Sequence, residues 1–170
     1  MAPGDGHGRG FPCDSLRRLG RSFVKAFVGV GLLLREPNAR IHVAAALTVI
    51  GAGRLVGLDP LEWAVIVLNV GLVLALETLN TALEGYVDLA APGRDEVAAR
   101  AKDAAAGAVL IAAASSVLVA AFIFGPRLEE LRTALLQAWR LRPGPSAAYA
   151  AVVLGFLLSG VLWRGKWPPR

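Results

Sequence analysis

The sequence predicts an all-α membrane protein that crosses the bilayer several times. The first observation is composition: 55% of the 170 residues are hydrophobic and 18% are charged, which is too apolar for an ordinary soluble domain. The second is that the apolar residues gather in stretches close to the roughly 20 residues that a helix needs to cross a bilayer core. These stretches are 41–58, 61–76, 104–124 and 147–163. The alternative is a set of buried helices in a soluble bundle.

The first forty residues are expected to lie outside the hydrocarbon core. Residues 1–14 are rich in Gly and Pro and predict a disordered tail. Residues 15–35 mix basic and apolar positions, which suits an amphipathic helix at the membrane interface. Glu36-Pro37-Asn38 should break that helix, because proline disfavours the helical conformation at the residue before it. A removable signal peptide is not expected, since no apolar run of sufficient length precedes Val24.

Local signals mark the ends of the second and third spans. Asp59-Pro60 is a capping residue followed by proline and predicts the start of a helix. That helix is expected to continue to Asp88, over about 40 Å, so its last turns should leave the membrane core on the cytoplasmic side. Pro92-Gly93-Arg94 predicts a turn, Asp95-Glu96 can cap the third span, and Gly125-Pro126 should end it.

Residues 127–170 predict a C-terminal extension. The segment 127–141 resembles a second interfacial helix, with Leu128, Leu131, Leu135 and Trp139 near one face. Pro143-Gly144-Pro145 is interpreted as a linker to a fourth transmembrane helix.

The distribution of basic residues predicts the topology. The net charge of +5 is spread over the regions between the spans, which argues against a nucleic-acid partner. Because basic residues favour the cytoplasmic side, the N-terminus, the 90–102 loop and the C-terminal tail are placed inside, and the 57–60 turn outside. The four arginines within 127–142 then lie outside, against the rule.

Three carboxylates and an amide close the second span. At about 100° per residue, Glu77, Asn80, Glu84 and Asp88 fall within roughly an 80° arc of one helix. Acidic groups at the edge of a membrane span are costly and are usually functional. The plain alternative is a set of solvated carboxylates or contacts between helices.

Other polar residues at the same predicted membrane face complement this acidic face. Glu36 comes from the first helical break, and Lys102 with Asp103 from the start of the third span. Oxygen ligands from two helices suit Mg²⁺, and a lysine suits phosphate oxygens. Glu77, slightly deeper, could accept a proton from a lipid hydroxyl. Together these residues favour phosphoryl transfer at a membrane surface.

These motifs resemble one known family. The pattern Glu77-x-x-Asn80-Thr-Ala-x-Glu84-x-x-Val87-Asp88, followed by Ala101-Lys102-Asp103, is similar to the signature of the small prokaryotic diacylglycerol kinases, which include the undecaprenol kinases. Glu36-x-Asn38-x-Arg40-Ile41-His42 also fits, and the resemblance covers about residues 22–126. It implies a lipid kinase membrane domain over 15–126 with three family transmembrane helices.

The resemblance also implies roles for individual residues. Glu77 would be the general base for the lipid alcohol, and Glu36 and Glu84 would hold Mg²⁺ with ATP. Asp88 would support the structure or the nucleotide site. The remaining residues implied to contact the nucleotide are Asn80, Gly93, Arg94, Asp95, Lys102 and Asp103. The family is a homotrimer with sites shared between neighbouring subunits.

The predicted function is therefore ATP-dependent phosphorylation of a lipid alcohol at the cytoplasmic face of a bacterial inner membrane. The segment 102–110 and the triplet Arg40-Ile41-His42 look more similar to the undecaprenol kinases than to the diacylglycerol branch, so undecaprenol is favoured and diacylglycerol is the alternative. An alternative from another class is a non-enzymatic protein that relays protons or ions. The third and fourth spans argue against it, because they carry few polar groups beyond Ser115, Ser116 and Ser159.

Overall fold

Residues 12–162 of the computed structural model are described here, and they are almost entirely helical. The elements in chain order are α1 (Pro12–Leu33), α2 (Pro37–Val56), α3 (Pro60–Ala90), α4 (Glu96–Phe124), the short 3₁₀ helix η1 (Gly125–Arg127), α5 (Leu128–Leu141) and α6 (Pro143–Val161). No strand occurs among these described residues. The predicted all-α fold class is confirmed.

Helix α1, up to Leu32, belongs to one compact unit, and the described residues from Leu33 on belong to a second. The helix begins at Pro12, three residues before the predicted start, and Phe23, Val24 and Phe27 are exposed on it. Its position at the membrane interface stays a prediction. Most of the predicted disordered tail, residues 1–11, lies outside the described residues.

The second unit contains four helical stretches long and apolar enough to cross a membrane. They are α2, α3, the run Glu96–Leu141 and α6. Large apolar side chains such as Leu61, Leu110 and Phe122 remain exposed on them, as expected for helices whose outer faces contact lipid. The chain is therefore a multi-pass membrane protein, with the fourth span that the sequence predicts.

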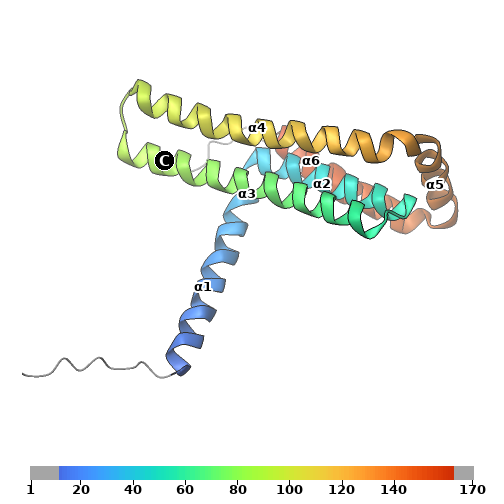
Figure 1. The fold of residues 1–170 in the computed structure, drawn as a ribbon, viewed down its shortest axis with the longest axis horizontal. Coiled ribbons are helices and arrows are strands. Elements are labelled where there is room, and N and C mark those ends of the chain that lie inside the picture. The colour runs from blue at the N-terminus through green and yellow to red at the C-terminus, as the bar shows by residue number, and fades with distance from the viewer. Residues whose placement is uncertain (1–11, 163–170) are drawn as a thin grey trace, which may run out of the picture. The chain divides into compact units, whose positions relative to one another are not determined.

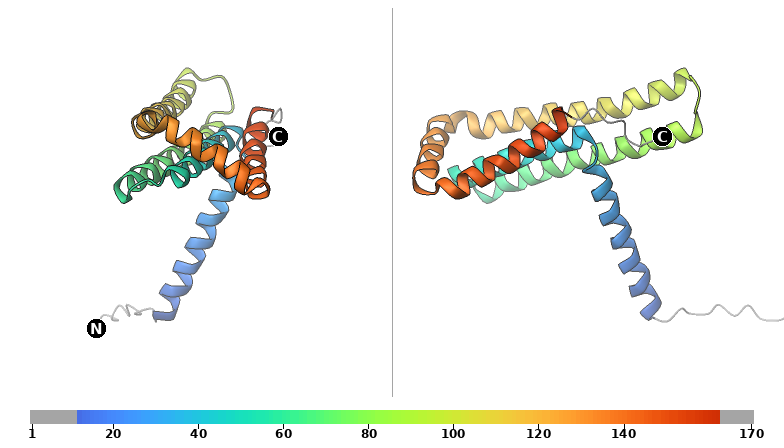
Figure 2. Two further views of the ribbon diagram at one scale, coloured as in Figure 1. Left: turned by 90° about the vertical axis from the view of Figure 1, so that its right-hand side faces the viewer. Right: turned by 180° about the vertical axis from the view of Figure 1, so that it is seen from behind.

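The helices of this unit pack as two antiparallel pairs, α3 with α4 and α2 with α6 (Figure 1). Helices α3 and α4 have 31 and 29 residues, whereas α2 and α6 have 20 and 19. The longer pair therefore projects beyond the shorter pair at the end where residues 91–95 connect α3 to α4 (Figure 1). Helix α5 lies at the opposite end (Figure 2).

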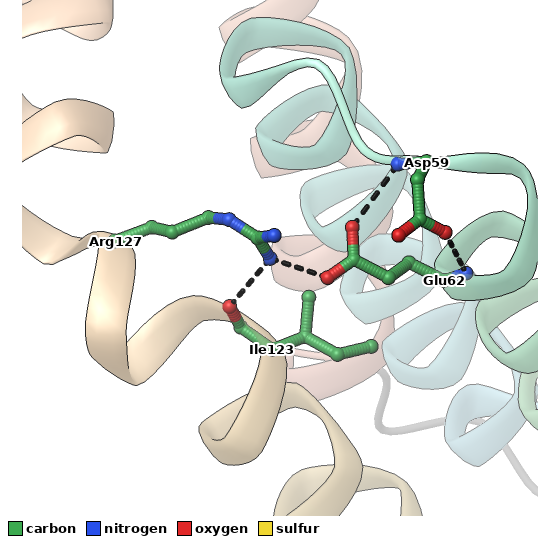
Figure 3. Close-up of polar contacts among 4 residues, drawn as sticks. All are labelled: Asp59, Glu62, Ile123 and Arg127. Atoms are coloured by element: carbon green, nitrogen blue, oxygen red, sulfur yellow. Dashed lines mark hydrogen bonds and ion pairs between the residues drawn. The ribbon is translucent and has the colours of Figure 1, made fainter.

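The end of the unit near α5 is held by a polar junction and an apolar cluster. Asp59 caps α3 in a reciprocal capping box with Glu62, as the Asp59-Pro60 signal predicts. The Arg127 guanidinium bonds to the Glu62 carboxylate at 2.6 Å and to the carbonyl of Ile123 at 3.1 Å (Figure 3). The junction therefore ties the start of α3 to the end of α4. The buried residues beside it are Val56, Leu58, Ile66 and Phe124.

Two glycines allow α6 to approach α2 closely. A Cβ on Gly51 would come within 2.7 Å of the Tyr149 hydroxyl, and one on Gly160 within 2.7 Å of the Pro37 carbonyl oxygen. The Tyr149 hydroxyl donates a hydrogen bond to the carbonyl of Leu47. Small residues at such contacts let membrane helices pack backbone against backbone.

The linker predicted at Pro143-Gly144-Pro145 is wrong. These residues form the first turn of α6, with Pro143 at its first position. Proline is well tolerated there, because the first N–H groups of a helix have no partner within the helix and the fixed φ of proline suits the helix. The prolines therefore start the helix instead of separating it from α5.

Candidate functional site

The acidic face of α3 is graded in exposure along the helix. Glu77 and Asn80 are buried, with 3% and 7% of their surface exposed. Glu84 is half-buried and Asp88 is exposed. This gradient runs toward the projecting end of α3 and α4 (Figure 1), as the sequence predicts for a helix that leaves the membrane core at Glu84 and Asp88.

Asn80 and Glu84 form a polar pair. The Asn80 side-chain N–H group donates to the Glu84 carboxylate at 2.8 Å. The Asn80 amide oxygen is buried and has no hydrogen-bond partner within the described residues. A buried acceptor without a partner is uncommon and costly. This oxygen is therefore available to a ligand.

Glu36 reaches the same region from the start of α2. It holds the N-cap position, with extended backbone (φ −74°, ψ 133°), but its side chain makes no capping hydrogen bond. Burial raises the pKa of Glu36 above its ordinary value, the neighbouring Glu84 carboxylate raises it further, and Arg40 opposes both. Glu77 also interacts electrostatically with Glu84 and Glu36. The three carboxylates, from α3 and from the start of α2, therefore lie close enough to influence one another electrostatically.

Arg40 fixes the backbone around Glu36. Its guanidinium donates hydrogen bonds to the carbonyls of Leu34 at 2.9 Å and Arg35 at 3.2 Å, and to the carbonyl of Ser159 on α6 at 3.3 Å. In the sequence, Arg40 belongs to the motif around Glu36, but nothing in that motif predicts a role for it. Its position one turn after Glu36 was the available signal, but the contact with Ser159 depends on the packing of α6.

A second group of predicted residues lines a pocket of about 590 Å³ in the hairpin between α3 and α4. Lys102 forms an ion pair with Asp88 across this hairpin, which accounts for the fourteen-residue step between them. Asp95 caps α4, because one of its oxygens accepts hydrogen bonds from the backbone N–H groups of Val97 and Ala98. The predicted site residues in this pocket are Asp88, Gly93, Arg94, Asp95 and Lys102.

The predicted residues thus form two neighbouring groups. The inner group is Glu36, Glu77, Asn80 and Glu84, and the outer group is the hairpin pocket. Glu84 and Asp88 lie one turn apart on α3 and connect them. Asp103 is exposed and belongs to neither group.

The inner group suits a hard cation by its chemistry. Glu36 and Glu84 offer carboxylate oxygens, and Asn80 offers its unpartnered amide oxygen. Mg²⁺ is commonly bound by one or two protein carboxylates, with phosphates and water completing the shell. No group of three or more His, Cys, Asp or Glu residues arranged to hold a metal occurs among residues 12–162.

The sequence of this chain is similar to those of known lipid kinases. The profile described as "Prokaryotic diacylglycerol kinase" matches residues 25–124. The chain is 44% identical over 77 residues to the undecaprenol kinase of Bacillus subtilis (strain 168), covering 45% of this chain and 63% of the relative. It is 44% identical over 69 residues to the diacylglycerol kinase of Synechocystis sp. (strain ATCC 27184 / PCC 6803 / Kazusa), covering 40% of this chain and 39% of the relative. No solved structure gives a significant match.

The matched residues span less than two thirds of each relative. The profile, in contrast, covers more than half of this chain and includes every predicted site residue from Glu36 to Asp103. Helices α5 and α6 lie beyond its end. On this match the chain belongs to the prokaryotic diacylglycerol kinase family.

Proposed function

We propose that this protein phosphorylates a membrane lipid alcohol with ATP, at the cytoplasmic side of a bacterial inner membrane. The observation that carries the proposal is the placement of buried Glu77 beside Glu36 and Glu84. The hairpin pocket with Lys102 lies toward the projecting end of the same helices. Lipid and nucleotide can therefore approach one another from the membrane and from the aqueous side.

Glu77 is proposed to act as the general base. Its carboxylate would take the proton of the lipid hydroxyl as the hydroxyl oxygen attacks the γ-phosphorus of ATP. A new O–P bond forms, the bond from the γ-phosphorus to the bridging oxygen of ADP breaks, and the proton remains on Glu77. Burial excludes water from this carboxylate, which limits the competing hydrolysis of ATP.

Lys102 and the hairpin pocket would hold the phosphate chain. An ammonium group at a phosphate stabilises the negative charge of the transferring group. Arg94 lines the same pocket and offers a second cation. Mg²⁺, when held by Glu36, Glu84 and Asn80, would supply further neutralisation of phosphate charge.

An apolar cavity of about 300 Å³ lies between α2, α3 and α4 on the membrane side of Glu77. Val73, one helical turn before Glu77, lines it together with His42 and several alanines and valines. A hydrocarbon chain could lie in this cavity while its hydroxyl reaches Glu77. This supports a lipid acceptor in preference to a soluble alcohol.

Undecaprenol is the proposed lipid, and diacylglycerol is the alternative. The support is the similarity to the undecaprenol kinase of B. subtilis, which covers 63% of that protein, against 39% of the diacylglycerol kinase of Synechocystis. The family resemblance further implies a homotrimer with shared sites. Cross-linking in native membranes tests the assembly, and parallel assays with both lipids in the same membranes test the substrate.

The decisive experiment follows transfer of labelled phosphate from ATP into extracted lipid. Glu77→Gln keeps the size of the side chain but removes the base, so activity should fall about 100-fold or more. Glu130→Gln, at an exposed position of α5, is the matched control and should retain full activity. Both variants should insert and assemble like the wild type. Full activity of Glu77→Gln would refute the base assignment, and no labelled lipid from the wild type would refute the kinase proposal.

A further inference from the structure

A groove lies between α2, α5 and α6. Helix α5 lies at the end of the unit opposite the connection between α3 and α4 (Figure 2). The volume of the groove is about 780 Å³. Most of its lining comes from α5 and α6, beyond the residues that the family profile matches. The groove therefore belongs to the extension of this chain and is separate from the candidate active site.

The walls of the groove are apolar and aromatic. Leu131, Leu135 and Trp139 line it from α5, and Tyr149 and Leu154 line it from α6. Helix α6 is long and apolar enough to cross a membrane, whereas α5 is a 14-residue amphipathic helix that turns its leucines and Trp139 to the groove. A groove of this kind at the edge of a membrane protein is accessible to hydrocarbon chains, and Trp and Tyr favour the level of the lipid headgroups.

Two arginines, Arg54 and Arg142, line the same groove. Arg54 lies over the Trp63 ring, with 5.9 Å between the guanidinium carbon and the ring centroid. Among the described residues, no carboxylate lies within ion-pair distance of either guanidinium. The groove therefore combines apolar walls with two positive charges that no protein carboxylate balances.

Neighbouring arginines at this end of the unit differ in this respect. Arg127 pairs with Glu62 at 2.6 Å, and Arg132 pairs with Glu129 at 3.3 Å. The arginines between 127 and 142 are also those that lie outside in the predicted topology, against the usual distribution of basic residues. A negatively charged ligand from the membrane would complement Arg54 and Arg142 in the groove.

We propose that this groove binds one anionic phospholipid. The headgroup phosphate accepts charge-assisted hydrogen bonds from Arg54 and Arg142, and the acyl chains pack along the leucines of α5 and α6. Guanidinium groups suit phosphate because their donors match its oxygens in pairs. The bound lipid would join α5 and α6 to α2 at a place where the protein itself leaves a groove.

The test measures which phospholipids the full-length protein retains. The protein is purified from membranes, exchanged into detergent with equal amounts of phosphatidylglycerol and phosphatidylcholine, and analysed by native mass spectrometry. The wild type should retain one phosphatidylglycerol in preference to phosphatidylcholine. The double variant Arg54→Gln/Arg142→Gln should lose that preference by about tenfold. Both lipids carry a phosphate, but the choline cation cancels its charge in phosphatidylcholine, so the preference depends on the two guanidinium charges of the groove.

Two further variants separate the groove from general charge effects. Arg140→Gln removes an exposed positive charge of α5, two residues before Arg142 and outside the groove lining, and should keep the preference. Ala150→Trp fills the groove with both arginines intact and should lower retention of phosphatidylglycerol.

The proposal is overturned if the double variant keeps the preference of the wild type, or if Arg140→Gln loses it equally. Retention of both lipids alike by the wild type would show that the arginines select no headgroup. An oligomer that retains neither lipid would show that a second copy of the chain covers the groove. None of these outcomes depends on kinase activity.

Discussion

At the candidate site, the charged side chains differ in how strongly the surrounding protein encloses them. Glu77 is 3% exposed, whereas the side chains of Lys102 and Asp88 are 32% and 63% exposed. A partly exposed ion pair contributes only about 0–1 kcal/mol to stability. The outer residues can therefore be changed with little effect on folding, which allows their role in binding to be measured.

Lys102→Met is expected to weaken ATP binding without unfolding the protein. The KM for ATP should rise by about tenfold, because an ammonium group at the phosphates is lost. The melting temperature in detergent should change little. Kinetics at varied ATP concentration and thermal unfolding measure the two effects.

Arg100→Met is the matched control for Lys102→Met. Arg100 pairs with Glu96 on the same helix at 3.1 Å, and the two side chains are 78% and 88% exposed. This variant should change neither the KM nor the melting temperature. An equal rise in KM in both variants would indicate general electrostatic attraction of ATP and not a specific contact with Lys102.

The raised pKa of Glu36 predicts a dependence of stability on pH. Burial and the Glu84 carboxylate raise this pKa, and Arg40 compensates only in part. A carboxyl group that binds its proton more tightly in the folded state opposes folding once it ionises. The free energy of unfolding therefore falls as the pH rises above 4.5, the ordinary pKa of a glutamate, and through the higher pKa of Glu36 in the folded state.

Glu36→Gln should remove this cost. In the absence of divalent cations, the variant should melt at a higher temperature than the wild type at about pH 7.5. The difference should disappear below about pH 4, where both states of the wild type carry the proton. Thermal unfolding at a series of pH values measures this. A difference that does not change with pH would contradict the electrostatic explanation.

At the level of the helices, the sequence predicts each element but not its partners. Local signals such as Asp59-Pro60 and Gly125-Pro126 mark where α3 begins and where α4 ends, because capping and proline effects act within a few residues. The pairing of α6 with α2 has no such signal. It depends on where Gly51 and Gly160 meet a neighbouring helix, which only the three-dimensional packing determines.

The same distinction holds for the candidate site. Helical periodicity placed Glu77, Asn80 and Glu84 on one face, since this follows from the geometry of a single helix. Arg40 donates hydrogen bonds to carbonyls from two separate parts of the chain, beside Glu36 and on α6. Glu62 and Arg127 likewise lie 65 residues apart, and nothing in either local sequence selects the other as its partner.

Gly160→Leu tests whether α6 supports the candidate site. A side chain at this position would press against the Pro37 carbonyl and Ile41 at the start of α2, directly after Glu36. Overpacking of this kind typically costs about 1–3 kcal/mol. Both the melting temperature and the transfer of phosphate to lipid should therefore fall.

Gly155→Leu is the matched control on the same helix, because no atom lies within 4 Å of a Cβ built there. It should leave both quantities close to those of the wild type. A loss of stability in Gly160→Leu with unchanged phosphorylation would show that α6 braces α2 without positioning Glu36.

In the membrane unit as a whole, the acidic candidate site and the arginines of α5 lie toward opposite ends. The hairpin pocket lies where α3 connects to α4, with Glu84 and Asp88 in the last turns of α3 before it. Helix α5 with its arginines lies at the opposite end of the unit (Figure 1). Since ATP is cytoplasmic, the proposed function requires the hairpin end to face the cytoplasm. The basic residues give the same orientation for the 90–102 loop, although α5 with its arginines then faces outside.

Cysteine accessibility tests this orientation directly. In a Cys13→Ser background, which removes the only cysteine, single cysteines are placed at Pro92 in the hairpin and at Gln137 on α5, both exposed positions. A membrane-impermeant maleimide should label Gln137→Cys in spheroplasts, whereas Pro92→Cys should react only after the membrane is permeabilised. Labelling of both after permeabilisation confirms that each thiol is reactive. If Pro92→Cys reacts in sealed spheroplasts, the hairpin lies outside, away from cytoplasmic ATP, and the proposed kinase function fails together with the predicted topology.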